Sequence, residues 1–171
     1  GRLPVHPTFF EATTAIAFEL FRQASVDVAV IEVGLGGRFD ATNVLPAPVG
    51  AITSIGFDHQ QQLGDTLDAI AFEKAGIIKP GMTVVAGRLP RAASSTIARV
   101  AAECGAELLE ATDGVRLESA MLDGHAVLTV DTPAARYGPF RLALRGAHQV
   151  GNALVAIRVL EAARGAGVSV P

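Results

Sequence analysis

The sequence predicts an α/β fold with a mostly parallel sheet, flanking helices and a later antiparallel β excursion. Apolar, β-branched runs alternate with helical patterns as far as about residue 110, which is typical of parallel strands covered by helices. After Asp113 the pattern changes to short strands around an Asp-Gly turn, which favours an antiparallel hairpin. The 171 residues, half of them hydrophobic, are enough for one domain with its own core.

The first part of the chain predicts one helix and two buried strands. Residues 8–11 have the Thr/Glu spacing of a capping box, so we expect a helix from about residue 9 to 23. Residues 26–33 and 49–55 are apolar and β-branched at nearly every position, the pattern of strands buried on both faces of a parallel sheet. We therefore expect these two segments and residues 83–86 to be neighbouring parallel strands.

The rest of the chain continues the alternation and then leaves it. A glycine after each of two helical patterns, Gly76 and Gly105, marks where those helices end. The remaining predicted helices cover residues 66–75, 91–104 and 148–164. The remaining predicted strands cover residues 83–86 and 107–109, and the antiparallel excursion covers residues 112–144.

Composition excludes several classes of protein. A net charge of -3 and a pI of about 5.8 give no electrostatic case for binding nucleic acid. No apolar run approaches the ~20 residues that a membrane-spanning helix needs. Cys104 is the only cysteine, so no internal disulfide can form, which fits a reducing, cytoplasmic location.

Two residues stand where ligands bind in open parallel sheets, and a third lies on the next helix. Glu32 ends one apolar run and His59 follows another, so both are expected at the carboxyl edge of the sheet. A carboxylate there suits a hard cation, although Glu32 could equally be a solvated strand end and His59 a structural histidine. Lys74 lies on the following helix, where it could simply be an exposed lysine near a helix C-terminus.

Nucleotide-binding motifs are incomplete in this sequence. The Gly-Leu-Gly-Gly run after Glu32 does not match a dinucleotide fingerprint, and no G-x-x-x-x-G-K-[ST] loop occurs. Amide side chains at the start of the last helix, on Gln149 and Asn152 beside His148, could read a base edge or serve as ordinary caps.

The block from residue 32 to 79, the Thr-Phe-Phe-Glu start at residue 8 and the His148-Gln149 pair with Asn152 strongly resemble one family. This is the central ATPase domain of the folylpolyglutamate synthase/dihydrofolate synthase family, a branch of the Mur ligase superfamily. The resemblance runs from residue 8 through the last helix and is weak over residues 112–140.

The resemblance implies a glutamate ligase that uses ATP and Mg²⁺, with dihydropteroate or folate and L-glutamate as substrates, joined through an acyl phosphate. It implies three catalytic metal-site residues, of which the lysine is carbamylated: Glu32, His59 and Lys74. It implies two substrate-contacting segments: Thr8, Phe9, Phe10 and Glu11, and Phe39, Asp40 and Ala41. It implies that Asn152, with His148 and Gln149, lies at the nucleotide base. We expect the three metal-site residues to converge at the carboxyl edge of the sheet.

The family's P-loop and C-terminal domain have no counterpart in these residues. Residues 1–171 are therefore interpreted as a partial central ATPase domain that needs the missing N- and C-terminal parts of the same enzyme, and we expect it to be inactive alone. Two alternatives stay open: another Mur-type ligase, such as one acting on a peptidoglycan precursor, or a non-catalytic binding module without a P-loop. The run from Arg38 to Asn43 favours the folate branch.

Overall fold

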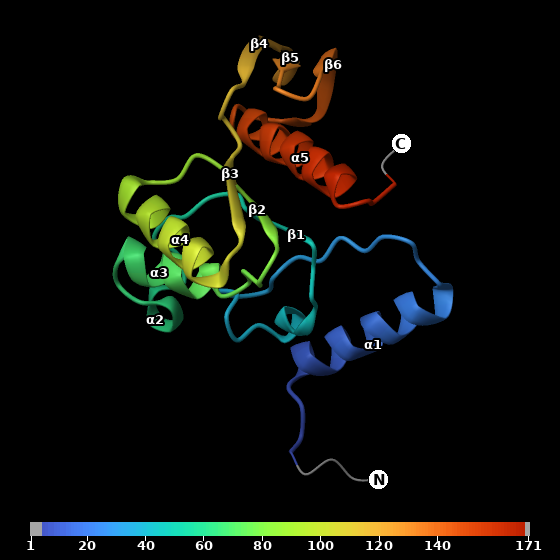
Figure 1. The fold of residues 1–171 in the computed structure, drawn as a ribbon, viewed down its shortest axis with the longest axis vertical. Helices are drawn as coiled ribbons and strands as arrows, with labels where there is room; N and C mark the ends of the chain where they lie inside the picture. The colour runs from blue at the N-terminus through green and yellow to red at the C-terminus, as the bar shows by residue number, and fades with distance from the viewer. Residues whose placement is uncertain (1–4, 170–171) are drawn as a thin grey trace.

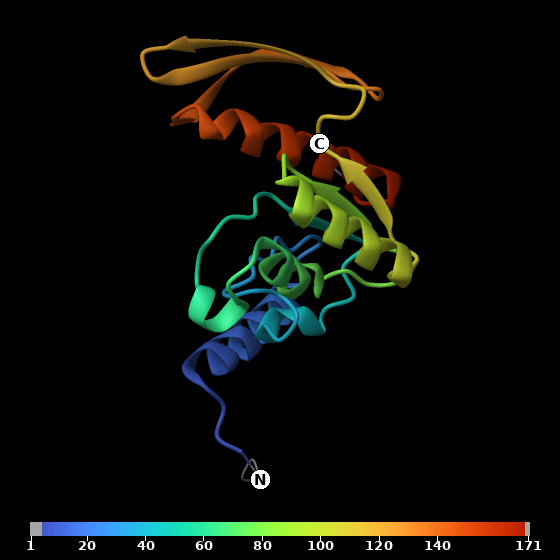
Figure 2. The ribbon, with the colours of Figure 1, turned by 90° about the vertical axis from the view of Figure 1, so that its left-hand side faces the viewer.

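A computed structural model describes residues 5–169 and places two three-stranded sheets on opposite sides of one long helix, α5 (His148–Gly165) (Figure 1). The parallel sheet lies against one side of α5 and the antiparallel sheet against the other (Figure 2). None of the helices in the described part of the chain is long and apolar enough to span a membrane.

The parallel sheet has the order β1-β2-β3, with β1 at Val49–Ile52, β2 at Thr83–Ala86 and β3 at Glu107–Glu110. In the register Val49 pairs with Thr83 and Thr83 with Glu107. The predicted pairing of the 49–55 and 83–86 segments as parallel neighbours is confirmed, although β1 is shorter than predicted. The two faces of β2 are both covered: Val84 is buried among residues of α3 and α4, and Val85 among residues of α5 and the antiparallel sheet.

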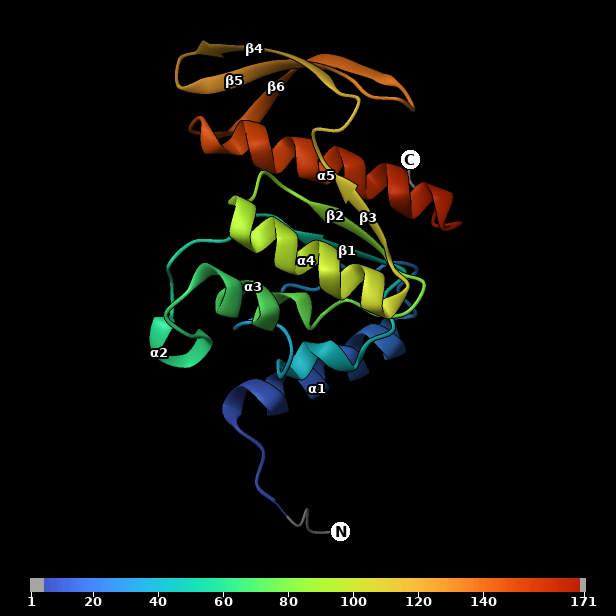
Figure 3. The ribbon, with the colours of Figure 1, turned by 60° about the vertical axis from the view of Figure 1, so that its left-hand side comes forward.

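Helices α3 (Leu67–Ala75) and α4 (Arg91–Cys104) cover one face of this sheet (Figure 3). Each ends at the glycine that the sequence predicts, Gly76 after α3 and a left-handed Gly105 after α4. At the start of α3 the Thr66 side chain, which was not singled out from the sequence, accepts a hydrogen bond from the Ala69 amide. Ile70 and Ile97 are fully buried between the two helices and the sheet. A four-residue helix, α2 (Gln60–Leu63), was not predicted.

The antiparallel sheet consists of β4 (Arg116–Leu122), β5 (His125–Asp131) and β6 (Arg136–Arg145). Asp123 and Gly124 both have positive φ, 51° and 76°, as the predicted tight hairpin turn requires. Along β5 alternate residues are buried against α5: Ala126, Leu128 and Val130.

A buried polar cluster joins α5 to this sheet. The Glu161 carboxylate accepts hydrogen bonds from the hydroxyls of Thr132 and Tyr137 and pairs with the Arg158 guanidinium at 2.7 Å. Only about a tenth of the Arg158 and Glu161 side chains is exposed. Every oxygen of the carboxylate is therefore engaged, which a buried charge requires.

The N-terminal region differs from the prediction in one respect. Helix α1 (Phe9–Ala24) forms with the expected capping box between Thr8 and Glu11. Residues 26–33, however, form no strand, and Val30 is 95% exposed. A strand is held by hydrogen bonds to a neighbour, and no strand of the described chain pairs with this segment. The prediction that residues 26–33 are a buried parallel strand beside β1 is therefore wrong for these residues.

Candidate functional site

A hollow of about 230 Å³ gathers three parts of the chain. These parts are the glycine-rich turn after residue 32, the residues before α2, and the last turn of α3. The lining residues are Val33, Gly34, Leu35, Gly36, Asp58, His59, Leu63 and Lys74. His59 and Lys74 therefore share one hollow, whereas Glu32 is exposed and precedes its first lining residue.

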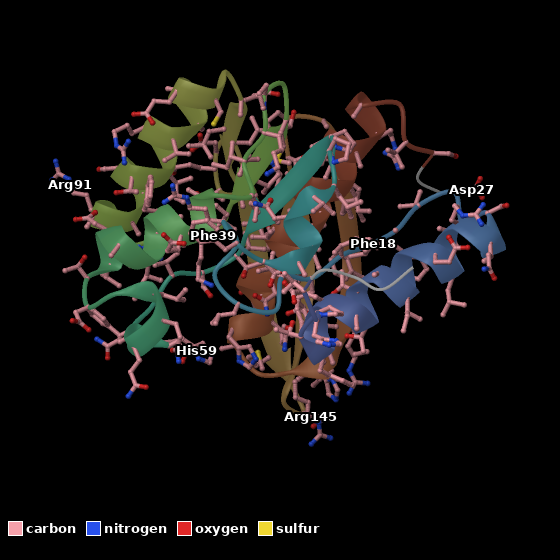
Figure 4. All side chains as sticks on the ribbon, turned by 90° about the horizontal axis from the view of Figure 1, so that it is seen from below. Phe18, Asp27, Phe39, His59, Arg91 and Arg145 are labelled. Atoms are coloured by element: carbon pink, nitrogen blue, oxygen red, sulfur yellow. The ribbon has the colours of Figure 1, made fainter. Side chains whose placement is uncertain are left out.

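His59 stands at the start of α2 in a left-handed conformation, with φ 50° and ψ 38° (Figure 4). Non-glycine residues rarely adopt this conformation, and it is concentrated at functional sites. The Asp58 carboxylate accepts a hydrogen bond from the His59 amide at 2.8 Å, and its second oxygen lies 3.7 Å from the imidazole Nε2. Asp58 was not singled out from the sequence, although its position after β1 and next to His59 carried that signal.

Lys74 lies in the last turn of α3 and is half-buried. Within residues 5–169 its ammonium makes no hydrogen bond and no ion pair. Lys79, the second of the chain's two lysines, reaches the Gly76 carbonyl at 3.5 Å instead. Lys74 is thus the lysine that faces the hollow without a protein partner.

The turn that walls the hollow is held by Asp40. Its Oδ2 accepts hydrogen bonds from the Gly34 and Leu35 amides at 3.0 and 3.1 Å, and its Oδ1 accepts from the amide and hydroxyl of Thr42. Burial alone would raise the pKa of the Asp40 carboxyl, but the hydrogen bonds from Thr42, Leu35 and Gly34 together hold it below its ordinary value. The Gly34 and Leu35 amides are therefore occupied within the loop.

The two predicted substrate segments meet at this turn. A Cβ on Gly34 would lie 2.6 Å from Cζ of Phe10, so the Phe10 ring packs directly against the glycine. Phe9 and Phe39 are 85% and 84% exposed, which leaves both rings open to a ligand. Thr8 and Glu11 bond to each other at the start of α1, and hydrogen bonds from the Thr8 amide and hydroxyl lower the pKa of Glu11. Ala41 begins the 3-10 helix η1 (Ala41–Val44).

The predicted nucleotide-base residues lie in the first turns of α5. The Asn152 amide donates to Gln149 Oε1 at 3.0 Å, and the Gln149 amide nitrogen lies 3.1 Å from His148 Nε2. The start of α5 and helix α2 lie on the same side of the molecule in two views (Figures 2 and 3). The predicted base residues thus lie outside the hollow, on a helix that packs on the opposite face of the parallel sheet from α3 and α4.

The donors around the hollow suit a divalent cation only in part. The carboxylates of Glu32 and Asp58 and the imidazole of His59 are the oxygen and nitrogen donors that such ions accept. Within residues 5–169, however, no three His, Cys, Asp or Glu side chains come close enough together to hold a metal ion. The protein alone therefore supplies an incomplete set, to which Lys74 adds oxygen donors only if its amine is converted to a carbamate.

A second hollow of about 170 Å³ lies between the ends of β2 and β3 and the start of α4. It contains none of the residues that the sequence predicts for a site. Arg88 and Glu110 line it with opposite charges over an apolar floor that includes Ile97 and Leu108.

Comparisons with known proteins cover nearly the whole chain. A family model described as the Mur ligase middle domain matches residues 6–160. The chain is 41% identical to a dihydrofolate synthase/folylpolyglutamate synthase of Mycobacterium tuberculosis, covering 92% of this chain and 34% of that protein. It is 40% identical to a folylpolyglutamate synthase of Lacticaseibacillus casei, covering 88% and 36%. The chain thus spans about a third of the length of these curated relatives.

Solved structures agree with the sequence relatives. The fold matches a folylpolyglutamate synthase complex with AMPPCP at a TM-score of 0.92 and 35% identity, covering 98% of this chain and 42% of that one. It matches folylpolyglutamate synthase of Mycobacterium tuberculosis complexed with ADP and AMPPCP at 0.85 and 38% identity, covering 91% and 36%.

Proposed function

The chain belongs to the Mur ligase middle-domain family, and from this premise we propose that it is the middle part of an ATP-dependent glutamate ligase acting on dihydropteroate or folate. The observation that carries the proposal is the shared hollow of His59 and Lys74 in a chain whose relatives are folylpolyglutamate and dihydrofolate synthases. Neighbouring structures hold ADP or AMPPCP, and one holds folate, which supports these substrate classes. The proposal places the enzyme in the cytoplasm, which a lone unpaired cysteine fits.

In the proposed reaction ATP phosphorylates a carboxylate of the pteroate or folate substrate. The amine of L-glutamate then attacks the acyl phosphate, an amide bond forms, and phosphate leaves. Mg²⁺, when bound, would neutralise charge on the transferring phosphoryl group. Glu32 and His59 would hold the ion, and Lys74 would add carboxylate oxygens after its neutral amine takes up carbon dioxide and releases a proton.

The remaining predicted residues would bind the pteroate or folate substrate and the base of ATP. Phe9, Phe10, Phe39 and Ala41 would form the wall that receives the aromatic substrate, since Phe10 meets the loop at Gly34 and the other two rings are exposed. Thr8, Glu11 and Asp40 shape the same wall through hydrogen bonds to the chain. Asn152, with His148 and Gln149, would hydrogen-bond the nucleotide base.

The two lysines of the chain provide the test of this proposal. In a full-length protein that contains these residues, we expect Lys74→Ala to lower glutamate ligation by about 10–100-fold or more, because the metal site loses its oxygen donors. Lys79→Ala, the matched control outside the hollow, should change it little. The measurement is ATP-dependent incorporation of labelled glutamate into dihydropteroate and folate, with acetate added to seek partial rescue of Lys74→Ala.

Full activity in Lys74→Ala would show that the catalytic site is misplaced. A wild-type protein that ligates neither folate substrate but accepts another carboxylate would point to a different Mur-type ligase. A protein that hydrolyses no ATP with any of them would support the non-catalytic alternative.

A further inference from the structure

The loop from residue 34 to 43, which we call the wall loop, is tied to the end of the helix that carries Lys74 by the side chain of Asn43. The Asn43 amide nitrogen donates to the Arg38 carbonyl and to the Gly76 carbonyl, both at 3.0 Å. The second bond joins residues 33 positions apart. Gly76 caps the C-terminus of α3, one residue after that helix ends. One bond of the half-buried amide therefore closes the wall loop on itself, and the other joins the loop to the end of α3.

Close backbone contact supports this junction. The Arg38 amide donates to the Glu73 carbonyl at 2.9 Å, and a Cβ on Gly76 would lie 2.3 Å from the Arg38 Cα. The Arg38 side chain also reaches α3: its guanidinium lies 5.0 Å from the ring centroid of Phe72 and 3.7 Å from the Glu73 carboxylate. Loop and helix thus meet backbone to backbone at Arg38 and Gly76, and small shifts of one must be accommodated by the other.

The other end of the wall loop is fixed by Asp40, whose carboxylate accepts from the Gly34 and Leu35 amides. Gly34 and Leu35 line the hollow, as does Lys74, whereas Asn43 does not. Two polar side chains within four residues therefore connect one wall of the hollow to the helix turn that presents Lys74.

We infer that Asn43 and Asp40 are positioning residues for the proposed ligation, which keep the substrate-side wall of the hollow in fixed register with Lys74. The inference rests on the proposed function. Neither side chain reaches a reactant: Asn43 lies outside the hollow, and the Asp40 oxygens are occupied by four hydrogen bonds. Their effect passes through the backbone of the wall loop and the end of α3.

The sharpest variant is Asn43→Asp in the full-length protein. It keeps the size of the side chain but replaces two donors with a carboxylate oxygen that faces two carbonyl oxygens, which reverses attraction into repulsion. Gln23→Glu is the matched control, since it makes the same amide-to-carboxylate change on α1, where Gln23 bonds only to Glu19. Asn43→Ser, which keeps one donor and adds no charge, is the second variant in case Asn43→Asp fails to fold.

We expect kcat per folded molecule to fall by about 10–100-fold in Asn43→Asp, because misplacement of a reacting group by about 1 Å has that effect. The KM for ATP should stay within about twofold, since the predicted base residues lie on α5 and not on the wall loop. Hydrogen exchange at the Gly34, Leu35 and Arg38 amides should accelerate while exchange in β2 stays slow. Asn43→Ser should change kcat and these exchange rates in the same direction but less. Gln23→Glu should change neither.

The test must separate a fall in kcat of the folded protein from a fall caused by unfolding of the whole protein. A wild-type kcat per folded molecule in Asn43→Asp, or in Asn43→Ser if the first variant does not fold, would overturn the inference. So would a loss that only follows the unfolded fraction. Absence of ligation by the wild-type protein would instead defeat the proposed function, so the two failures are distinguishable.

Discussion

Helices α4 and α1 are similar in length, 14 and 16 residues, yet their surroundings differ greatly. Helix α4 buries Ile97, Val100 and two alanines against the parallel sheet. Helix α1 buries only Thr14 and leaves Ile16 and Leu20 more than half exposed. An apolar stripe predicts that a helix face will seek cover, but it does not say what provides that cover.

The same contrast separates the two most similar apolar runs. Residues 83–86 pair on both sides and are buried, whereas residues 26–33 have no partner and expose Val26, Val28 and Val30. Both runs are rich in valine, so composition does not explain the difference. A β-branched run becomes a strand only where neighbours supply hydrogen bonds and a packing surface.

The largest expected difference between α4 and α1 is in how much an isoleucine-to-alanine substitution lowers stability. We expect Ile97→Ala to lower the free energy of unfolding by about 2–5 kcal/mol, because it opens a cavity at a fully buried position. Ile16→Ala makes the same change on α1 at a side chain that is 59% exposed, and it should alter the free energy by less than about 0.5 kcal/mol. Urea unfolding measures the free energy of unfolding of both variants. Equal losses of stability would contradict the difference between the two helices.

A smaller effect is expected where α5 meets the antiparallel sheet. Burial, followed by the hydrogen bond to Glu161 and its negative charge, raises the pKa of Tyr137. The folded state therefore holds the phenol proton more tightly than the unfolded chain. The resulting stability is fully present below the unfolded pKa of about 10 and is lost as pH rises through the raised folded pKa.

Tyr137→Phe should remove this pH dependence and lower stability at neutral pH by about 1–3 kcal/mol, the contribution of a hydrogen bond to a buried carboxylate. Tyr137 is the chain's only tyrosine, so alkaline tyrosine absorbance follows this one group. The measurement is urea unfolding of wild type and variant at about pH 8 and about pH 10.5. An equally steep alkaline loss in both proteins would show that another group is responsible.

Local signals in the sequence predicted most elements correctly. The Thr8–Glu11 capping box, the glycines that end α3 and α4 and the Asp123-Gly124 turn each act within a few residues, so the sequence contains all the information they need. Residues 26–33 failed because their structure depends on a neighbour. For the site, a strand end pointed to His59 and the family resemblance pointed to Lys74, but the left-handed His59 and the Asn43 bridge to Gly76 arise from contacts that no local pattern records.

The central claim is that these 171 residues supply one wall of a ligase site and depend on further chain for turnover. Phosphoryl transfer relies on a loop of amides and a lysine around the β- and γ-phosphates, and no sequence of that kind occurs here. The direct measurement is ATP-dependent glutamate ligation by the purified 171-residue chain and by a longer polypeptide that contains it. The account predicts turnover only from the longer polypeptide, and robust turnover by the 171-residue chain alone would contradict it.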